Sequence, residues 1–573
     1  GARIDTQTFN TTLAQVLAHS DIGGDAATDG GLTKSGGGIL TLTSGANTYT
    51  GATIINQGTI DVRTSVNSLP AASAVTLAGG AALTHTLNGA TIANSVSGNG
   101  TWTLNVLSGA INNFGLTGTN AGFTGAINIG AGARLIVGSG WTTAAGIPNA
   151  SAVIQVANGG SVYYFGGSGA LNNPITLNGD GVAEGAPGPY GALRVDGGVT
   201  YGGHVTLGSN ARIGSQSGHG ILSGGVTIGA NTLTLNTSNS NLTFTGNLTS
   251  TSAGAVVKTG TFTAILGGDN SGLLGTVTVT LSNMFLNSAT AASASAAWVV
   301  NAGTLANTLA GTPTHNLGSF GGSGGSLGNN VGGSAVTYSI GALGTDTTYS
   351  GTIVNTIGGG GTTALTKVGG GSLTLAGANS YTGNTLVSGG TLVISGSTAT
   401  AGLIQVSSGA TLGGGGSGGV ATVADLGVLA PGHTGDNHLL LAELTLSNDA
   451  VLRFDLDAPL ADPMSIVPDA ASDHVATSGA LMLDGKLRIN ALAGFGTPVS
   501  GNRWLLMTAD SGVADGVLEV DTLNSPALSG GLSYLIDADS NPGYVYLAVV
   551  PEVGTASLFL LGLAALLRAR KRR

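Results

Sequence analysis

The chain has 573 residues, with 102 glycines, 14 prolines and no cysteine. Disulfides, thiolate catalysis and cysteine-based metal sites are therefore excluded, and the low proline content without a Gly-X-Y period excludes collagen. Charged residues make up only 8% and hydrophobic residues 42%, the opposite of the balance found in disordered chains. The net charge of −10 disfavours nucleic acid as a partner, because a negative surface repels phosphate.

The first element that stands out is a repeat that occurs twice, at residues 32–62 and 365–394. Both copies contain Leu-Thr-Lys, a triple glycine, Leu-Thr-Leu, Gly-Ala-Asn and Tyr-Thr-Gly, in that order. Apolar residues alternate with threonine, which predicts short strands with one apolar face. The glycines and the Gly-Ala-Asn step predict sharp corners. Short strands joined by such corners are typical of the coils of a β-solenoid.

This unit resembles the autotransporter-associated β-strand repeat. Degenerate copies at 98–137 and 256–286 keep parts of the pattern, such as Lys258-Thr-Gly in the second of them. The resemblance implies a secreted or surface-exposed parallel β-helix, and it does not imply an enzyme.

Between the repeats, short strands rich in Thr, Val and Leu are separated by Gly, Asn and Ser. Parallel sheets usually need helices on both faces, and no segment here has a convincing helical period. The sheets of a β-helix avoid this need because they fold against each other and bury a shared interior. We therefore predict an all-β fold, with a right-handed parallel β-helix (β-solenoid) over residues 1–419.

The densest polar group of the repeat region lies between Asp180 and His219. β-helix polysaccharide lyases and hydrolases carry acids and Arg or Lys on one outer sheet face, where they act as general acids and bases. Prolines interrupt the group, however, and charged residues are common on solvated loops. We assign no catalytic residue and leave glycan contact open for five residues: Asp180, Glu184, Arg194, Asp196 and His204.

Residues 420–550 are rich in acidic residues and have longer strands. They predict final coils followed by an antiparallel β cap, because an uncapped last coil would expose a strand edge. Asp537, Asp539 and Asn541 resemble the start of a calcium loop, but Pro542 stands where such a loop needs glycine, so a hairpin turn is favoured. The eight histidines show no metal-ligand spacing, and neither a metal nor a cofactor is predicted.

Residues 551–573 are predicted to form a sorting signal. Pro551-Glu552 precedes an apolar run, 554–567, and a basic end that consists of Arg568, Arg570, Lys571, Arg572 and Arg573. The arrangement resembles a PEP-CTERM signal, although Val553 replaces the second proline. The resemblance implies cleavage by an exosortase-like enzyme, with 554–567 as a short hydrophobic helix that holds the chain transiently in the cytoplasmic membrane. A plain C-terminal membrane anchor is the alternative.

Together these features favour a secreted or cell-surface structural or adhesion protein, a rigid β-helical rod that contributes to the extracellular matrix. Extracellular polysaccharide and neighbouring surface proteins are the expected partners. Two alternatives stay open. One is a glycan-binding or glycan-cleaving β-helix that uses the polar face at 180–219. The other is an autotransporter passenger without its translocator barrel.

Overall fold

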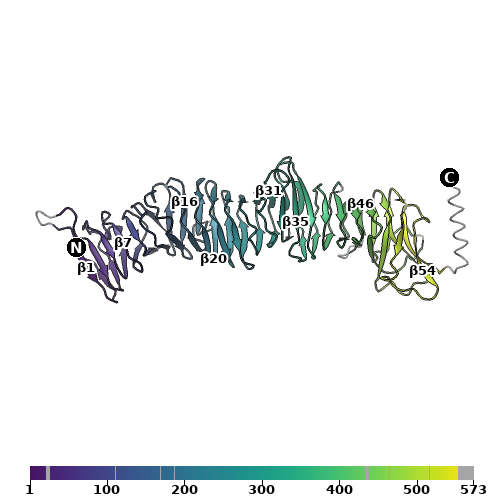
Figure 1. Ribbon diagram of the computed structural model, residues 1–573, viewed down its shortest axis with the longest axis horizontal. Helices are drawn as coiled ribbons and strands as arrows, with labels where there is room; N and C mark the ends of the chain where they lie inside the picture. Colours follow the sequence, from purple (N-terminus) through teal and green to yellow (C-terminus); the bar gives the residue numbers. More distant parts are fainter. Residues whose placement is uncertain are drawn as a thin grey trace. The chain divides into compact units, whose positions relative to one another are not determined.

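The computed structural model describes residues 1–20, 26–109, 111–167, 169–185, 188–399, 401–432, 438–463, 465–514 and 516–552 (Figure 1). The chain divides into two compact units. Unit 1 comprises Gly1–Gly318 with Gly324–Ser326, and unit 2 comprises Ser319–Ser323 with Leu327–Arg573. This division does not test the domain boundaries predicted at 419 and 550, which stay predictions.

Unit 1 is built from short strands and one 3-10 turn, η1 (Val66–Ser68). The strands are β1 (Ala2–Asp5), β2 (Thr11–Leu13), β3 (Leu32–Ser35), β4 (Ile39–Leu42), β5 (Thr53–Ile55), β6 (Thr59–Arg63), β7 (Val75–Leu77), β8 (Ala82–Leu87), β9 (Ala90–Ile92), β10 (Val96–Gly98), β11 (Thr101–Val106), β12 (Asn112–Leu116), β13 (Ala126–Ile129), β14 (Ala133–Val137), β15 (Val153–Val156), β16 (Ser161–Phe165), β17 (Ile175–Gly179), β18 (Leu193–Asp196), β19 (Thr200–Tyr201), β20 (Val205–Gly214), β21 (Gly220–Leu222), β22 (Val226–Gly229), β23 (Thr232–Asn236), β24 (Leu242–Phe244), β25 (Leu248–Ser250), β26 (Ala255–Thr259), β27 (Ala264–Leu266), β28 (Thr276–Val279), β29 (Asn283–Leu286), β30 (Ala297–Val300), β31 (Thr304–Asn307) and β32 (Thr314–Leu317).

Each coil of unit 1 pairs in parallel with the coil that follows it. Leu32 of β3 faces Thr53 of β5, Thr53 faces Val75 of β7, and Val75 faces Val96 of β10. Each step advances 21 or 22 residues along the chain. This regular parallel register, in stacked sheets, gives the β-solenoid-like all-β fold that the repeats predict.

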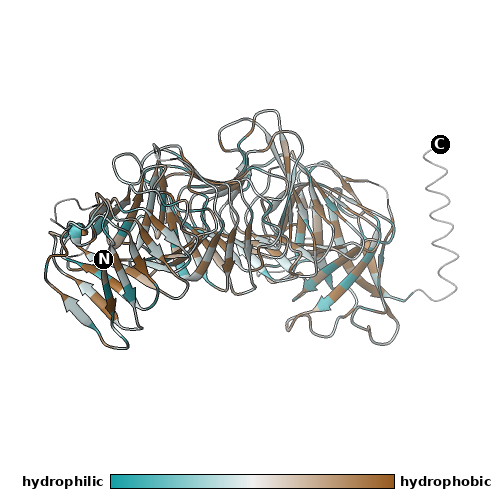
Figure 2. Cartoon of the chain, turned by 60° about the vertical axis from the view of Figure 1, so that its left-hand side comes forward, coloured by the Kyte–Doolittle hydropathy of each residue, from teal (hydrophilic) through white to brown (hydrophobic). Residues whose placement is uncertain are grey.

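The alternation of apolar and polar residues decides which side chains form the core. On β4 the side chains of Leu40 and Leu42 are buried, and Thr41 between them is half-buried. Figure 2 shows the same mixture of hydrophobic and hydrophilic positions along many strands. The in-register pairing then carries the Thr41 position from β4 to β25 as one row: Thr41, Asp61, Thr84, Thr103, Asn128, Gln155, Thr176, Thr206, Thr227 and Thr249.

Glycine is required at the corner that follows the first strand of each full repeat. Gly36 and Gly369 have φ angles of 75° and 69°, a region that residues with a Cβ avoid. A Cβ on Gly36 would lie 2.3 Å from the backbone nitrogen of Gln7, and one on Gly369 would lie 2.0 Å from the carbonyl oxygen of Gly341. The triple glycines therefore permit close stacking of one corner on the preceding coil.

Unit 2 continues the same construction and ends differently. Its strands are β33 (Ser319–Gly321), β34 (Ser326–Asn329), β35 (Ala335–Ile340), β36 (Thr347–Tyr349), β37 (Thr352–Thr356), β38 (Thr362–Lys367), β39 (Ser372–Leu375), β40 (Thr385–Val387), β41 (Thr391–Ile394), β42 (Leu403–Val406), β43 (Thr411–Gly414), β44 (Ser417–Val423), β45 (Val428–Pro431), β46 (His438–Leu446), β47 (Val451–Leu456), β48 (His474–Thr477), β49 (Leu481–Met482), β50 (Gly485–Ala491), β51 (Arg503–Ala509), β52 (Val513–Ala514), β53 (Leu518–Val520), β54 (Leu532–Asp537) and β55 (Tyr544–Pro551).

The end of unit 2 contains the antiparallel pairing predicted for residues 420–550. Strands β44, β46, β48 and β51 pair in parallel in that order. Strand β55 then pairs antiparallel with both β51 and β54.

Within the described residues, no helix has the length and apolarity needed to cross a membrane. The predicted helix at 554–567 and the basic end lie outside the described residues.

Candidate functional site

Three buried lysines occupy the same place in three copies of the coil pattern. Lys34, Lys258 and Lys367 are at most 1% exposed. Each Nζ donates to two carbonyls at its own corner and to one carbonyl of the following coil, at 2.6–3.2 Å. The acceptors are Ser35, Gly36 and Gln57 for Lys34, Thr259, Gly260 and Leu281 for Lys258, and Val368, Gly369 and Gly389 for Lys367. Burial lowers the pKa of Lys258 to about 8.

Buried asparagines make a second connection between coils. In each case the side-chain Oδ1 accepts a backbone N–H of the preceding coil, and Nδ2 donates to a carbonyl of the following coil, at 2.8–3.1 Å. These asparagines are Asn47, Asn120, Asn270 and Asn379. One side chain therefore satisfies two backbone groups that a corner would otherwise leave unpaired.

The Tyr-Thr-Gly step of the repeat also points inward. The hydroxyl oxygens of Tyr49 and Thr53 are 2.9 Å apart, and those of Tyr381 and Thr385 are 2.7 Å apart. All four side chains are buried, and burial raises the pKa of Tyr381 to about 12. The lysines and asparagines of the repeat thus bond one coil to the next, and its tyrosines bond within their own coil.

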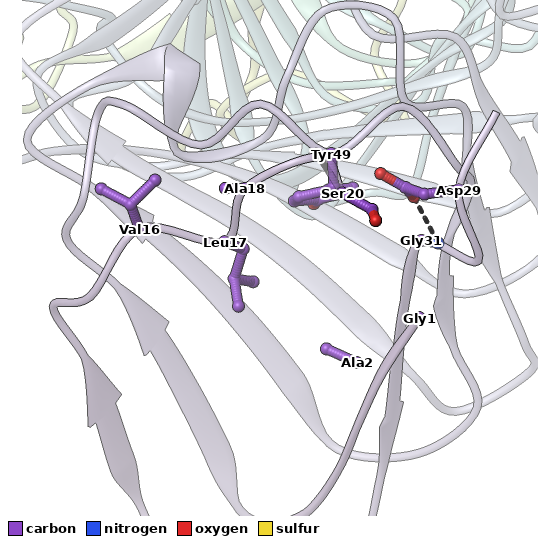
Figure 3. Close-up of a pocket in the computed structure, with 9 residues that line it drawn as sticks. All are labelled: Gly1, Ala2, Val16, Leu17, Ala18, Ser20, Asp29, Gly31 and Tyr49. Carbon is purple, nitrogen blue, oxygen red and sulfur yellow. Dashed lines mark hydrogen bonds between the residues drawn. The ribbon is translucent and has the colours of Figure 1, made fainter. Parts of the chain in front are cut away.

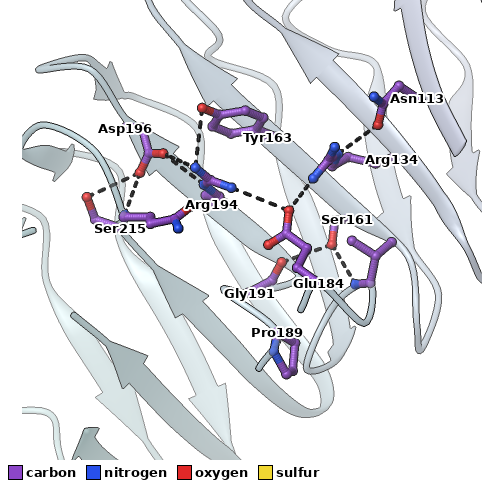
Figure 4. Close-up of polar contacts among 12 residues, drawn as sticks. Asn113, Arg134, Ser161, Tyr163, Glu184, Pro189, Gly191, Arg194, Asp196 and Ser215 are labelled. Atoms are coloured by element: carbon purple, nitrogen blue, oxygen red, sulfur yellow. Dashed lines mark hydrogen bonds and ion pairs between the residues drawn. The ribbon is translucent and has the colours of Figure 1, made fainter. Parts of the chain in front are cut away.

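A group of charged and aromatic side chains on β14, β16, β18 and the connection before β18 departs from the Thr- and Asn-rich strands (Figure 4). We call it the arginine cluster: Arg134, Tyr163, Glu184, Arg194 and Asp196. Strand register places Tyr163 beside Arg194, whose guanidinium carbon lies 4.1 Å from the centre of the tyrosine ring. Burial, partly opposed by Arg194, raises the pKa of Tyr163.

Both carboxylates of the arginine cluster are occupied. Glu184 accepts from Arg134 and also from Arg194, the latter at 3.3 Å. Asp196 is 1% exposed, lies 2.7 Å from Arg194 Nη2 and accepts the backbone N–H of Gln216, also at 2.7 Å. A catalytic general base or nucleophile needs a carboxylate that is free to meet substrate. The cluster instead pairs two arginines with two acids.

The cluster also fixes the segment that carries Glu184. Ser161 Oγ on β16 accepts the backbone N–H of Val182 at 2.8 Å and donates to the carbonyl of Gly191 at 3.0 Å (Figure 4). Both flanks of the segment are therefore tied to the sheet. Stabilisation of this loop is the role that the geometry of the cluster supports.

The other two predicted glycan-contact residues lie apart from these carboxylates. Asp180 pairs with Arg212 at 3.3 Å, and its side chain is exposed. His204 Nε2 lies 3.0 Å from Thr227 Oγ1, on the wall of a separate cavity of about 490 Å³. The structure thus brings together Glu184, Arg194 and Asp196 but not His204. Glycan contact by the five residues stays a prediction.

A cavity of about 460 Å³ adjoins the arginine cluster and was missed by the sequence analysis. Its walls include Asn88, Thr91, Asn112, Asn113 and Trp141. Asn113 joins the two features, because its Oδ1 accepts from Arg134 Nε at 2.9 Å. Asparagines and glycines mark corners throughout this chain, so they gave no separate signal. The signal that could have pointed to this cavity was Trp141, because tryptophan is rare in this chain, with four residues.

A cavity of about 310 Å³ lies at the first coils (Figure 3). Asp29 in its wall accepts backbone N–H groups of Gly31, Thr50 and Gly51 at 2.8–2.9 Å and lies 3.1 Å from His19 Nδ1. Burial opposes ionisation of Asp29, but these hydrogen bonds hold its pKa well below the usual range. The carboxylate therefore secures a corner.

Two adjacent titratable groups are buried in unit 2. Asp473 accepts the backbone N–H of Asp455 at 2.7 Å, and burial, together with the Asp455 charge, raises its pKa to about 7. Burial lowers the pKa of His474 to about 4. In the part of the chain that the structure describes, no group of three or more His, Asp or Glu side chains could hold a metal ion.

The segment at 537–541 forms a hairpin connection. Strands β54 and β55 flank it in antiparallel register. Asp537 Oδ1 accepts backbone N–H groups of Asp539 and Ser540, and Arg503 donates to Oδ2 at 2.5 Å. The hairpin favoured by the sequence is therefore present.

Comparison with known proteins identifies the repeat. Residues 32–62 and 365–394 match the family model of the passenger-associated-transport-repeat. The adhesin BmaC autotransporter of Brucella suis biovar 1 (strain 1330) is 42% identical over 80 residues, which make up 14% of this chain and 2% of that protein. Among solved structures, the Haemophilus influenzae Hap adhesin aligns with a TM-score of 0.31 and 12% identity, over 91% of this chain and 64% of that chain. The predicted autotransporter-type repeats are thereby confirmed at these two segments.

Proposed function

We propose that this protein is a non-enzymatic adhesion protein of the cell surface or extracellular matrix. The observation that carries the proposal is the pair of matched repeats, 32–62 and 365–394, whose buried lysine and asparagine side chains bond adjacent coils to each other. The relative with the matching segment is named as an adhesin. The proposal for the whole fold is a right-handed parallel β-helix closed by the antiparallel strands β51, β55 and β54.

The non-enzymatic role is supported by the arginine cluster. This cluster joins four charged side chains of unit 1, and its carboxylates are already bound by Arg134 and Arg194. The long polar row that begins at Thr41 consists of neutral hydroxyl and amide side chains, apart from Asp61. Such a surface suits hydrogen bonding with polysaccharide or with neighbouring surface proteins, the partners that we propose.

We propose sorting by the C-terminal segment. Pro551 and Glu552 are exposed at the end of β55, a position that a processing enzyme can reach. The proposal that an exosortase-like enzyme cuts there, and that 554–567 anchors the chain in the cytoplasmic membrane beforehand, rests on the sequence.

The test is to follow the native protein by cell fraction and by surface labelling, in cells that produce it and in cells from which its gene is deleted. We expect surface-exposed protein, an intact mass that ends near Pro551, and weaker attachment of the deletion strain. Protein confined to the cytoplasm, or unchanged attachment, would contradict the proposed function. A full-length chain that stays in the membrane fraction would contradict only the processing step.

A further inference from the structure

Trp141 differs from the other three tryptophans of the chain. Trp102, Trp298 and Trp504 are at most 1% exposed. Their indole N–H groups donate to His85 Nδ1 and to the carbonyls of Ser293 and Asp457. Trp141 is only half-buried, lines the 460 Å³ cavity, and its indole N–H has no partner among the described residues. A partly exposed tryptophan with an unused donor is suited to a ligand that has both apolar and hydroxyl surfaces.

We propose that this cavity binds a neutral saccharide, with Trp141 as the platform for the sugar ring and the asparagines as its hydrogen-bonding partners. The inference rests on the proposed adhesive function and gives it a site and a ligand class. The volume of about 460 Å³ lies within the range of small-ligand sites.

The asparagines of the cavity are held in place by bonds that leave one end of each amide available. Asn88 Oδ1 accepts the backbone N–H and the hydroxyl of Ser108, at 2.8 and 3.2 Å, and within the described part of the chain its Nδ2 donates to nothing. Asn112 Nδ2 donates to the carbonyl of Ser108 at 2.9 Å, and its Oδ1 has no partner among the residues that the structure describes. The wall thus offers both donors and an acceptor, as vicinal sugar hydroxyls require.

The arginine cluster orients the third amide. Arg134 Nε donates to Asn113 Oδ1 at 2.9 Å, while another nitrogen of Arg134 binds Glu184. Asn113 Nδ2 is therefore left for a ligand. Arg134 acts as a positioning residue, and its charge is offset by Glu184. Since the paired charges beside the cavity balance, the site has no net attraction for an anionic sugar, and a neutral one fits best.

Gly115 allows the backbone at Trp141 to pack closely against β12, beside the cavity. A Cβ at Gly115 on β12 would lie 2.8 Å from the backbone carbonyl of Trp141. The absence of that side chain lets the loop with Trp141 lie directly against the strand. The next turn is anchored as well, because the Thr142 hydroxyl donates to the carbonyl of Ile136 at 2.6 Å.

The experiment titrates the full chain with neutral oligosaccharides (cellobiose, maltotriose and N,N′-diacetylchitobiose) and with anionic digalacturonate, by tryptophan fluorescence and calorimetry. We expect saturable binding of at least one neutral sugar with a change in fluorescence, and at least roughly tenfold weaker binding in Trp141→Ala and Asn113→Ala. Trp141→Phe should retain part of the affinity, since it keeps a ring. Phe9→Ala, which removes an aromatic that is 69% exposed, is the matched control and should bind normally.

Failure to bind any of the neutral sugars, stronger binding of digalacturonate, or unchanged affinity in Trp141→Ala and Asn113→Ala would overturn the proposal. If Trp141→Ala does not fold, Trp141→Phe and Asn88→Ala decide the matter. If a strain that carries Trp141→Ala displays the protein and attaches normally, this saccharide site is refuted but the adhesive function is not. Saccharide binding by a protein that never reaches the surface would refute the adhesive function instead.

Discussion

The Nζ of Lys367 donates a hydrogen bond to the carbonyl of Gly389, 22 residues further along the chain, at 3.2 Å. This bond joins the corner of one coil to the corner of the next. The same lysine also binds the carbonyls of Val368 and Gly369. A residue that defines the repeat in the sequence is thus a buried link between coils.

Replacement of Lys367 by methionine should destabilise unit 2. The apolar side chain has a similar length but leaves three carbonyls without their donor, and we expect a loss of about 3 kcal/mol in the free energy of unfolding, measured by denaturant titration. The matched control is Lys486→Met, because Lys486 is half exposed and its ammonium pairs with Asp449 at the surface. A Lys367 variant as stable as the Lys486 variant would contradict the structural role of the buried lysines.

Lys258 should make the stability of unit 1 depend on pH in the alkaline range. Burial lowers its pKa from 10.5 to about 8. Between these values the unfolded chain holds a proton that the folded chain has lost, so stability rises with pH, by up to about 3 kcal/mol. Unfolding curves of the wild type and of Lys258→Met between pH 8 and 10.5 test this. We expect a steeper rise in the wild type than in the variant, because the pKa of Lys34, which burial also lowers, contributes equally to both; equal slopes would be the contrary result.

Asp473 should make the stability of unit 2 fall as pH rises, the opposite of the effect of Lys258 in unit 1. Its pKa is raised from 3.8 to about 7, so in this window the folded chain binds the extra proton and stability falls as pH rises. Asp473→Asn keeps an acceptor for the N–H of Asp455 but cannot ionise. We expect the variant to exceed the wild type by on the order of 3 kcal/mol near pH 8.

The control is to compare the unfolding free energies of the wild type and Asp473→Asn near pH 4. There the two should be almost equally stable. His474 contributes an opposing trend, because its lowered pKa of about 4 makes stability rise from pH 4 to 6.5. This trend is common to both proteins and cancels in the difference. A pH-independent difference between wild type and variant would refute the raised pKa.

The hydroxyl pair of Tyr381 and Thr385 should show coupling in a double-mutant cycle. Tyr381→Phe leaves the buried Thr385 hydroxyl without its 2.7 Å partner, and we expect a loss of about 1 kcal/mol in unfolding free energy. In a chain that already carries Thr385→Val, Tyr381→Phe should lower the unfolding free energy much less. Additive effects of the two substitutions would show that the contact is not a stabilising bond.

The sequence alone determined the type of coil. Alternation in Leu-Thr-Leu is a local signal with a period of two, and triple glycine at a corner reflects a local need for positive φ, so strands and corners could be predicted without knowledge of distant partners. The hairpin after Asp537 was predicted from a similarly local turn signal. The antiparallel end of residues 420–550 was predicted for a different reason, the exposed strand edge that an uncapped last coil would leave.

Only the tertiary structure decided what the polar side chains do. Lys258 meets the carbonyl of Leu281, and Arg134 meets Glu184. These pairings depend on loop lengths and on the register of the coils. The sequence shows four tryptophans, but burial separates Trp141 from the other three. A side chain that contacts residues 20 or more positions away takes its role from how the coils stack, because only stacking sets its solvent exposure and its hydrogen-bond partners.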